Sequence, residues 1–181
     1  MTAPSGLAVL LERYFTDRMM RQRQASPHTI ASYRDTFCLL LGFAKIKLRK
    51  EPSDLRLDDL DADFVGAFLD YLEEKRGTSF RSRNTRLAAI RSFFKYAAFQ
   101  CPEYEALIQR VLAMPSKRWN RSQIEFLNRQ ETEALLKAPN PEAWSGRRDR
   151  VLMLIAVQTG LRVSELIALR HEDVALGQGA H

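Results

Sequence analysis

Apolar residues recur at helical spacing along most of this chain, and that pattern restricts what it can fold into. Within 7–18, 30–44, 64–72 and 87–97 the apolar side chains fall three and four residues apart. Such a stripe covers one face of an α-helix, which must pack against other stripes to leave water. The sequence therefore predicts a mainly α-helical fold.

Residues that begin or stop helices separate these stripes. Ser26-Pro27 places a good N-cap residue before a proline, which is tolerated at the first helical position. Asp61 can cap a third helix, and Gly77 suits its end. Cys101-Pro102 breaks the fourth helix. The stretch 48–60 contains a proline and mixed charges, so we expect a loop there.

The composition changes between positions 115 and 121, which are polar, basic and contain a proline. Such a stretch is typical of an interdomain linker. The sequence predicts one helical domain over 1–101, a linker over 102–122 that holds a short helix within 103–114, and the beginning of a second domain over 123–181.

The second domain is predicted to open with two helices. Asn128 and Glu131 have the spacing of a capping box at the start of the first. The run 151–157 is too apolar for an exposed helix, so we expect a helix that is buried on most sides. Gly160 stands where that helix would stop, since glycine adopts a left-handed backbone without steric cost.

Arg162 follows that turn and opens a short helix predicted over 163–169. Glu165 lies three residues further on, so the two side chains would share a helix face. An arginine beside a carboxylate at the exit of a buried helix is placed to grip an anion such as phosphate. A plain surface ion pair would explain the same spacing, because such pairs are common and weak.

Charge and cysteine usage restrict the class of protein. The chain has 28 Lys+Arg against 22 Asp+Glu, a net charge of +6, which favours a polyanionic partner such as nucleic acid. Cys38 and Cys101 lie far apart, and neither they nor the three histidines show metal-ligand spacing, so no metal is expected. We expect Cys38 to be a small core residue. A reducing cytoplasmic compartment fits, and no apolar segment is long enough to span a bilayer.

The densest positive charge lies between Lys75 and Lys95, where seven basic residues occur without an acid. Such a one-sign face is costly unless a polyanion neutralises it, although a solvated basic face is the alternative. Thr29, near the start of the second helix, could donate to a phosphate or serve only the helix cap. The linker cations could follow a phosphate backbone or belong to a mobile, non-binding segment. The candidate DNA-binding residues are Thr29, Arg81, Arg83, Arg86, Arg91, Lys95, Lys117, Arg118 and Arg121.

Three stretches together resemble the tyrosine recombinases, also called phage integrases. Residues 159–166 are similar to the signature around the family's first catalytic arginine. Residues 26–33 and 84–94 resemble the second and last helices of its SAM-like core-binding domain. The resemblance implies a four-to-five-helix core-binding domain, followed by the helical start of a mixed α/β catalytic domain.

The resemblance also implies a function. The family integrates and recombines double-stranded DNA through a covalent phosphotyrosine intermediate, without a cofactor or a required metal. Arg162 would stabilise the charge that develops on the scissile phosphate, and Glu165 would support the active-site arrangement. The family further implies self-association on paired recombination sites and a bacterial, DNA-associated location.

One part of the family pattern is missing. All five tyrosines (Tyr14, Tyr33, Tyr71, Tyr96 and Tyr104) precede the arginine motif, so no nucleophile can be assigned, and the family's lysine and His-x-x-Arg positions cannot be placed. We therefore expect a C-terminally truncated chain that binds DNA but cannot cleave it alone. The alternatives are the first part of a longer active enzyme and a helical protein-interaction module without DNA binding. The second half is expected to be less stable and prone to association.

Overall fold

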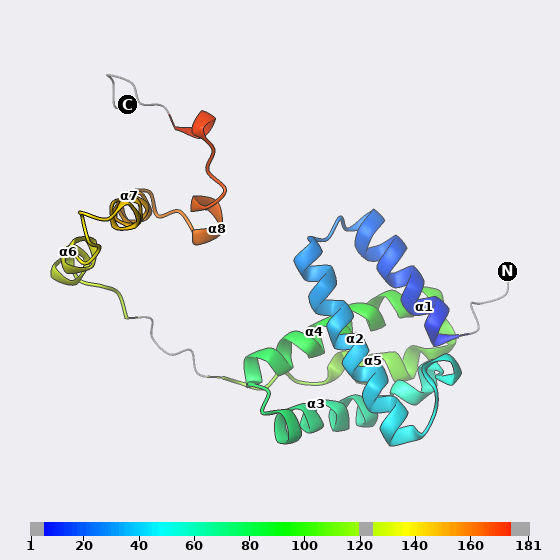
Figure 1. Ribbon diagram of the computed structural model, residues 1–181. Coiled ribbons are helices and arrows are strands. Elements are labelled where there is room, and N and C mark those ends of the chain that lie inside the picture. The colour runs from blue at the N-terminus through cyan, green and yellow to red at the C-terminus, as the bar shows by residue number, and fades with distance from the viewer. Residues whose placement is uncertain (1–5, 120–124, 175–181) are drawn as a thin grey trace. The chain divides into compact units, whose positions relative to one another are not determined.

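The computed structural model describes residues 6–119 and 125–174, and these residues form helices and turns without a strand (Figure 1). The predicted mainly α-helical fold is thereby confirmed. The chain divides into two units, Met1–Arg121 and Ser122–His181. Each unit is described by itself.

The first unit is built from five α-helices. A π-helical segment, η1, continues the first of them, and short 3-10 turns flank the others. The helices are α1 (Leu7–Arg13) with η1 (Tyr14–Gln22), α2 (Pro27–Leu48), α3 (Ala62–Arg76), α4 (Phe80–Gln100) and α5 (Glu105–Ala113), and the 3-10 turns are η2 (Pro52–Asp54), η3 (Leu57–Leu60) and η4 (Pro102–Tyr104).

The predicted start and stop residues act as expected. Ser26 Oγ accepts a hydrogen bond from the amide of Thr29 at 3.2 Å, and Asp61 Oδ1 accepts one from Phe64 at 2.7 Å. Each cap satisfies an amide at a helix start and contributes about 1 kcal/mol. Gly77 ends α3 with φ +60°. Local sequence therefore determines where α2 and α3 begin and where α3 ends.

The core of the first unit lies between α1 with η1, α2, α3, α4 and α5. Phe68, Leu87, Phe93 and Phe94 are fully buried within it, and Tyr14 packs edge-on against Phe93 with ring centroids 5.5 Å apart. Edge-to-face pairs add modestly to the stabilisation from apolar burial. The stretch expected to be a loop also contributes, because Leu55 is buried between its 3-10 turns and Leu57 and Leu60 are buried within η3.

Two features of the first unit differ from the expectation. Cys38 is exposed, not part of the core, because the buried stripe of α2 runs through its neighbours Phe37 and Leu40. Cys101 is the buried cysteine. The helix α5 falls inside the stretch predicted as linker, yet it packs on α4 and α3 and buries Ile108 and Val111. The first unit therefore includes α5.

The described part of the second unit contains α6 (Arg129–Lys137), α7 (Trp144–Thr159), α8 (Val163–Leu166) and a 3-10 turn, η5 (His171–Asp173). Asn128 and Glu131 form the expected capping box, with reciprocal bonds of 2.9 and 2.8 Å. Gly160 ends α7 with φ +68°. The helix α8 is shorter than predicted.

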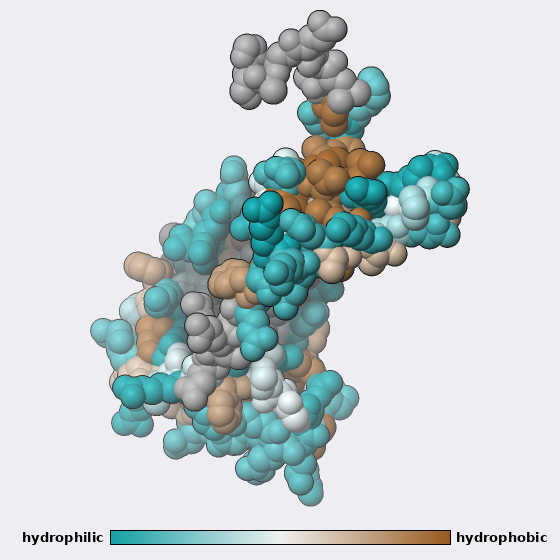
Figure 2. Space-filling model, turned by 90° about the vertical axis from the view of Figure 1, so that its left-hand side faces the viewer, coloured by the Kyte–Doolittle hydropathy of each residue, from teal (hydrophilic) through white to brown (hydrophobic). Residues whose placement is uncertain are grey.

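The helix α7 is not buried on most sides, so that prediction was wrong. Its side chains at Val151, Leu154 and Val157 remain 56%, 40% and 49% exposed. Only the short helices α6 and α8 contact α7 substantially, and they cannot cover all of its sides. Figure 2 shows hydrophobic surface, in brown, gathered on this unit. Among the described residues 125–174, Gly146 alone is buried.

Candidate nucleic-acid interface and arginine motif

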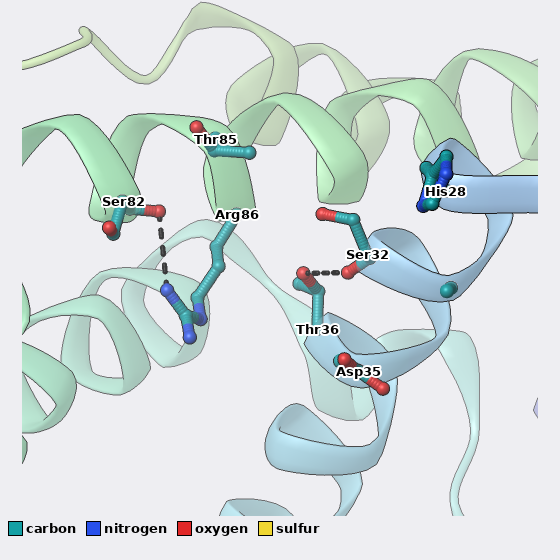
Figure 3. Close-up of a pocket in the computed structure, with 8 residues that line it drawn as sticks. His28, Ser32, Asp35, Thr36, Ser82, Thr85 and Arg86 are labelled. Atoms are coloured by element: carbon teal, nitrogen blue, oxygen red, sulfur yellow. Dashed lines mark hydrogen bonds between the residues drawn. The ribbon is translucent and has the colours of Figure 1, made fainter. Parts of the chain in front are cut away.

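The N-terminal halves of α2 and α4 line one polar hollow on the first unit (Figure 3). Sequence reasoning singled out the start of the second helix and the basic fourth helix separately. The structure brings them together. The polar residues around the hollow are His28, Ser32, Asp35 and Thr36 from α2, and Ser82, Thr85 and Arg86 from α4.

The hollow offers mostly hydrogen-bond donors together with one acid. Arg86 Nη1 donates to the carbonyl of Ser82 over 3.4 Å, and Thr36 Oγ1 donates to the carbonyl of Ser32 over 3.0 Å. The first of these bonds is long and therefore weak. Asp35 brings a negative charge, which disfavours a phosphate but could accept a bond from a base amino group.

Thr29 takes part in the cap of α2. Its amide is bonded to Ser26 Oγ, and the two hydroxyl oxygens lie 2.9 Å apart. The capping alternative for this residue is therefore present in the structure. Contact of Thr29 with a phosphate stays a prediction.

The cations of α4 do not share one face. Arg81 and Lys95 are exposed, whereas Arg86 and Arg91 are half-buried. Arg86 borders the polar hollow. Arg81 lies 5.7 Å from the ring centre of Trp119, and Arg91 Nη1 lies 3.4 Å from Ser116 Oγ, so both contact the chain that follows α5.

Arg83 differs most from the sequence-based expectation. Its side chain is only 7% exposed, and its Nε lies 2.5 Å from Oε1 of Glu73 on α3, which is 15% exposed. These two atoms lack aligned hydrogen-bond geometry, so charge attraction holds the pair. Arg83 precedes Leu87 by four residues, which places it on the apolar stripe of α4. It is unsuited to contact DNA in this structure.

The first linker cations are held in place. Lys117 Nζ forms an ion pair with Glu73 at 2.8 Å and lies 5.5 Å from the ring centre of Phe80. Arg118 and Arg81 border a second hollow together with Trp119. Arg121, the last predicted linker cation, lies outside the described residues.

Sequence reasoning missed Glu73 and Asn84. The side-chain amide of Asn84 donates to the carbonyl of Lys117 at 2.7 Å, and its Oδ1 accepts from the amide of Lys117 at 3.0 Å. The bonds that Lys117 makes to Asn84 and Glu73 join residues 33 and 44 positions apart. No local spacing signals such pairs, although two acids, Glu73 and Glu74, stand directly before the cluster of seven cations.

In the second unit, Arg162 and Glu165 meet as the spacing predicted. The amide of Arg162 donates to Glu165 Oε2 at 2.8 Å, and its guanidinium Nη1 lies 3.2 Å from Oε1. Glu165 therefore closes the first turn of α8 and also holds the arginine side chain, which is 82% exposed. The surface ion pair of the alternative interpretation is present, and the catalytic role of Arg162 stays a prediction.

The turn before Arg162 is fixed by Thr159. Its hydroxyl donates to the carbonyl of Ile155 at 2.6 Å and accepts from the amide of Leu161 at 3.3 Å. Together with the left-handed Gly160, these bonds set the direction in which the chain enters α8.

Within 6–119 and 125–174, no three His, Cys, Asp or Glu side chains gather as a metal site would require. No helix in the same residues is both long and apolar enough to cross a bilayer.

Comparison with known proteins places both units in one family. Residues 11–100 match the phage integrase N-terminal SAM-like domain, and residues 125–181 match the phage integrase family. The integrase/recombinase y4rC of Sinorhizobium fredii is 58% identical over this whole chain and 54% of its own length. Tyrosine recombinase XerC of Xanthomonas campestris pv. campestris is 31% identical over 91% of this chain and 48% of its own length.

The chain thus spans about half the length of these curated relatives. The two matches follow each other in the order of the two structural units and include the arginine motif. The chain belongs to the phage integrase family, the tyrosine recombinases.

Proposed function

We propose that this chain is the DNA-binding N-terminal portion of a site-specific tyrosine recombinase, and that its first unit binds duplex DNA. The observation that carries the proposal is the hollow where the starts of α2 and α4 meet. Helix N-termini attract phosphates because their amides and dipoles point outward. The major groove is wide enough to admit such a helix end.

The α4 cations take different parts in this proposal. Arg86 borders the hollow, and we assign it to a phosphate beside the hollow. Arg81 and Lys95 are exposed and suit phosphate contacts that position the helix. Arg91 is a weaker candidate for a phosphate contact because it already contacts Ser116. Arg118, which borders the second hollow, is a further candidate for such a contact. Arg83 is omitted because it is buried against Glu73.

The activity proposed for the longer protein is DNA integration or recombination by strand exchange through a phosphotyrosine. In that reaction Arg162 would stabilise the scissile phosphate, with Glu165 holding its side chain. Pairing of two recombination sites would require self-association. The 181-residue chain carries its five tyrosines within Met1–Arg121. A suicide DNA substrate should therefore trap no covalent adduct with this chain, and an adduct would contradict the proposal.

The test of DNA binding is fluorescence anisotropy with a labelled duplex at 50 and 200 mM salt. Four phosphate contacts should weaken binding about a hundredfold over that range, because each contact releases condensed counterions. Absence of binding at 50 mM salt would instead favour a helical protein-interaction module. Salt-independent binding would also contradict the proposed phosphate contacts.

A further inference from the structure

The chain that follows α5 runs back along α4. Ser116 contacts Arg91, Lys117 is hydrogen-bonded to Asn84, and Trp119 contacts Arg81. Later residues of the segment therefore contact earlier residues of α4. The segment 116–119 is therefore docked antiparallel to α4. It reaches the end of α4 that also borders the polar hollow.

Asn84 holds the backbone of this segment at one residue. Its amide group makes two bonds to Lys117, one as donor at 2.7 Å and one as acceptor at 3.0 Å. A carboxamide fits a peptide group in this way because both carry one donor and one acceptor side by side. Alanine could make neither bond, and aspartate could make only the accepting one.

Glu73 holds the side chain of the same residue. Its Oε2 lies 2.8 Å from Lys117 Nζ, while its Oε1 faces the buried guanidinium of Arg83. One carboxylate thus serves a cation of α4 and a cation of the following segment. Lys117 is consequently occupied by an acid of its own unit and is poorly placed to neutralise a phosphate.

We propose that Asn84 and Glu73 are positioning residues that anchor segment 116–119 to α4 and fix where the chain leaves the first unit. The anchor ensures that the segment reaches the N-terminal end of α4 at Trp119. Its consequence for DNA rests on the proposed function, since the anchor also keeps Arg118 beside Arg81 at the second hollow. Without it, Arg118 would no longer have a fixed place next to the DNA-facing end of α4.

Amide hydrogen exchange by NMR tests the anchor without DNA. Replacing Asn84→Ala should speed exchange of the Lys117 amide about tenfold, because that amide loses its acceptor. Asn84→Asp should restore slow exchange in part, since it keeps the acceptor oxygen. Gln109→Ala, on the exposed side of α5, is the control and should leave the Lys117 amide unchanged.

Amides of Leu87 and Ile90 in α4 report whether each variant is folded. If these stay slow and the Lys117 amide exchanges equally in the wild type and in Asn84→Ala, the anchor is refuted. If all amides exchange faster in Asn84→Ala, that variant is unfolded, and Asn84→Asp decides instead. With Asn84→Asp folded, a Lys117 amide that exchanges more slowly than in an unstructured peptide of residues 113–121 supports the anchor, because the acceptor oxygen remains. Exchange at the peptide rate refutes it.

DNA titration separates the anchor from the proposed function. The slope of log affinity against log salt should fall by about 0.9 in Asn84→Ala, because Arg118 would no longer neutralise one phosphate. A loss of folding alone would lower the active fraction without changing this slope. If the wild type fails to bind DNA, the proposed function fails while the exchange experiment still decides the anchor. An unchanged slope with accelerated exchange would overturn only the link between the anchor and DNA.

Discussion

Arg83 is a positive charge held inside the first unit, and Glu73 makes that position tolerable. Burying an isolated guanidinium is costly, because water no longer solvates the charge. The carboxylate of Glu73 supplies the counter-charge from α3 and also reaches Lys117 on the segment after α5. A single acid therefore joins three parts of the unit.

Replacing Glu73→Gln should destabilise the first unit by about 3 kcal/mol, because it leaves the charge of Arg83 buried without a partner. The matched control is Glu74→Gln, which removes the same charge one residue further along α3 at an exposed position. Urea denaturation followed by circular dichroism measures both. If both substitutions lower the free energy of unfolding equally, the Glu73–Arg83 ion pair makes no specific contribution to stability.

Tyr14 gives the first unit a pH dependence in alkaline solution. Burial raises the pKa of Tyr14 from 10.0 to about 12, while its hydroxyl donates to Ser92 at 2.9 Å. The folded state thus holds the proton more tightly than the unfolded state does. The resulting stabilisation is fully present below about pH 10 and is lost as the pH rises towards about 12.

The measurement compares the free energy of unfolding of the wild type with that of Tyr14→Phe at pH 8 and pH 11. Phenylalanine has no proton to lose, so the advantage of the wild type should shrink at the higher pH. All other ionisable groups are the same in the two proteins, so the comparison isolates the contribution of Tyr14. A difference that stays constant between the two pH values would contradict the buried tyrosine as its source.

At the scale of elements, α4 serves different purposes on different sides. Its buried stripe carries Leu87 and Ile90 together with Arg83, whereas Arg86 borders the hollow shared with α2. Arg81 contacts the segment that follows α5. The five cations of α4 are therefore divided among packing, anchoring and a candidate binding surface.

Replacing Arg86→Ala should lower the salt slope of DNA binding by about 0.9 and weaken affinity, because alanine cannot neutralise the phosphate that we assign to Arg86. Lys47→Ala is the matched control, since Lys47 is exposed near the far end of α2. Twenty residues of helix separate it from Pro27, a rise of about 30 Å. Equal slopes for the two variants would remove Arg86 from the interface.

The starts of the helices could be predicted from the sequence because they depend on interactions between residues that are close in the chain. Caps such as Ser26, Asp61 and Asn128 involve residues only three positions apart, so their chemistry is readable in the chain. The partners of Arg83 and Asn84 come from other segments, and only the fold brings them together. Counting cations within one stretch therefore overestimated the free positive charge on α4.

In the second unit, too, local sequence did not reveal which segments pack together. The run 151–157 has the composition of a buried helix, but burial depends on neighbours that composition does not reveal. Gly146 was not singled out either. A Cβ there would clash with the backbone carbonyl of Asn140, so the close approach of loop and helix requires glycine. The arginine motif itself was readable because Gly160, Arg162 and Glu165 act within six consecutive residues.

At the scale of the whole molecule, the two units differ in how much apolar surface they bury. Every buried apolar side chain within 6–119 and 125–174 belongs to the first unit. The described second unit leaves large apolar side chains exposed on its helices, including Val151, Leu154 and Val163. Apolar burial is the main favourable term in folding, so the second unit should open more readily.

Hydrogen exchange should therefore show faster exchange for amides of α7 than for amides of α4 in the same sample. The exposed apolar side chains of α7 should also promote association, because burying them against another copy removes them from water. Leu154→Asp should reduce that association in sedimentation experiments while leaving exchange in α4 unchanged. Glu133→Ala on α6 is an exposed control and should leave association as in the wild type. Equal protection of α7 and α4 at low protein concentration would contradict the difference in stability, because association cannot protect α7 under those conditions.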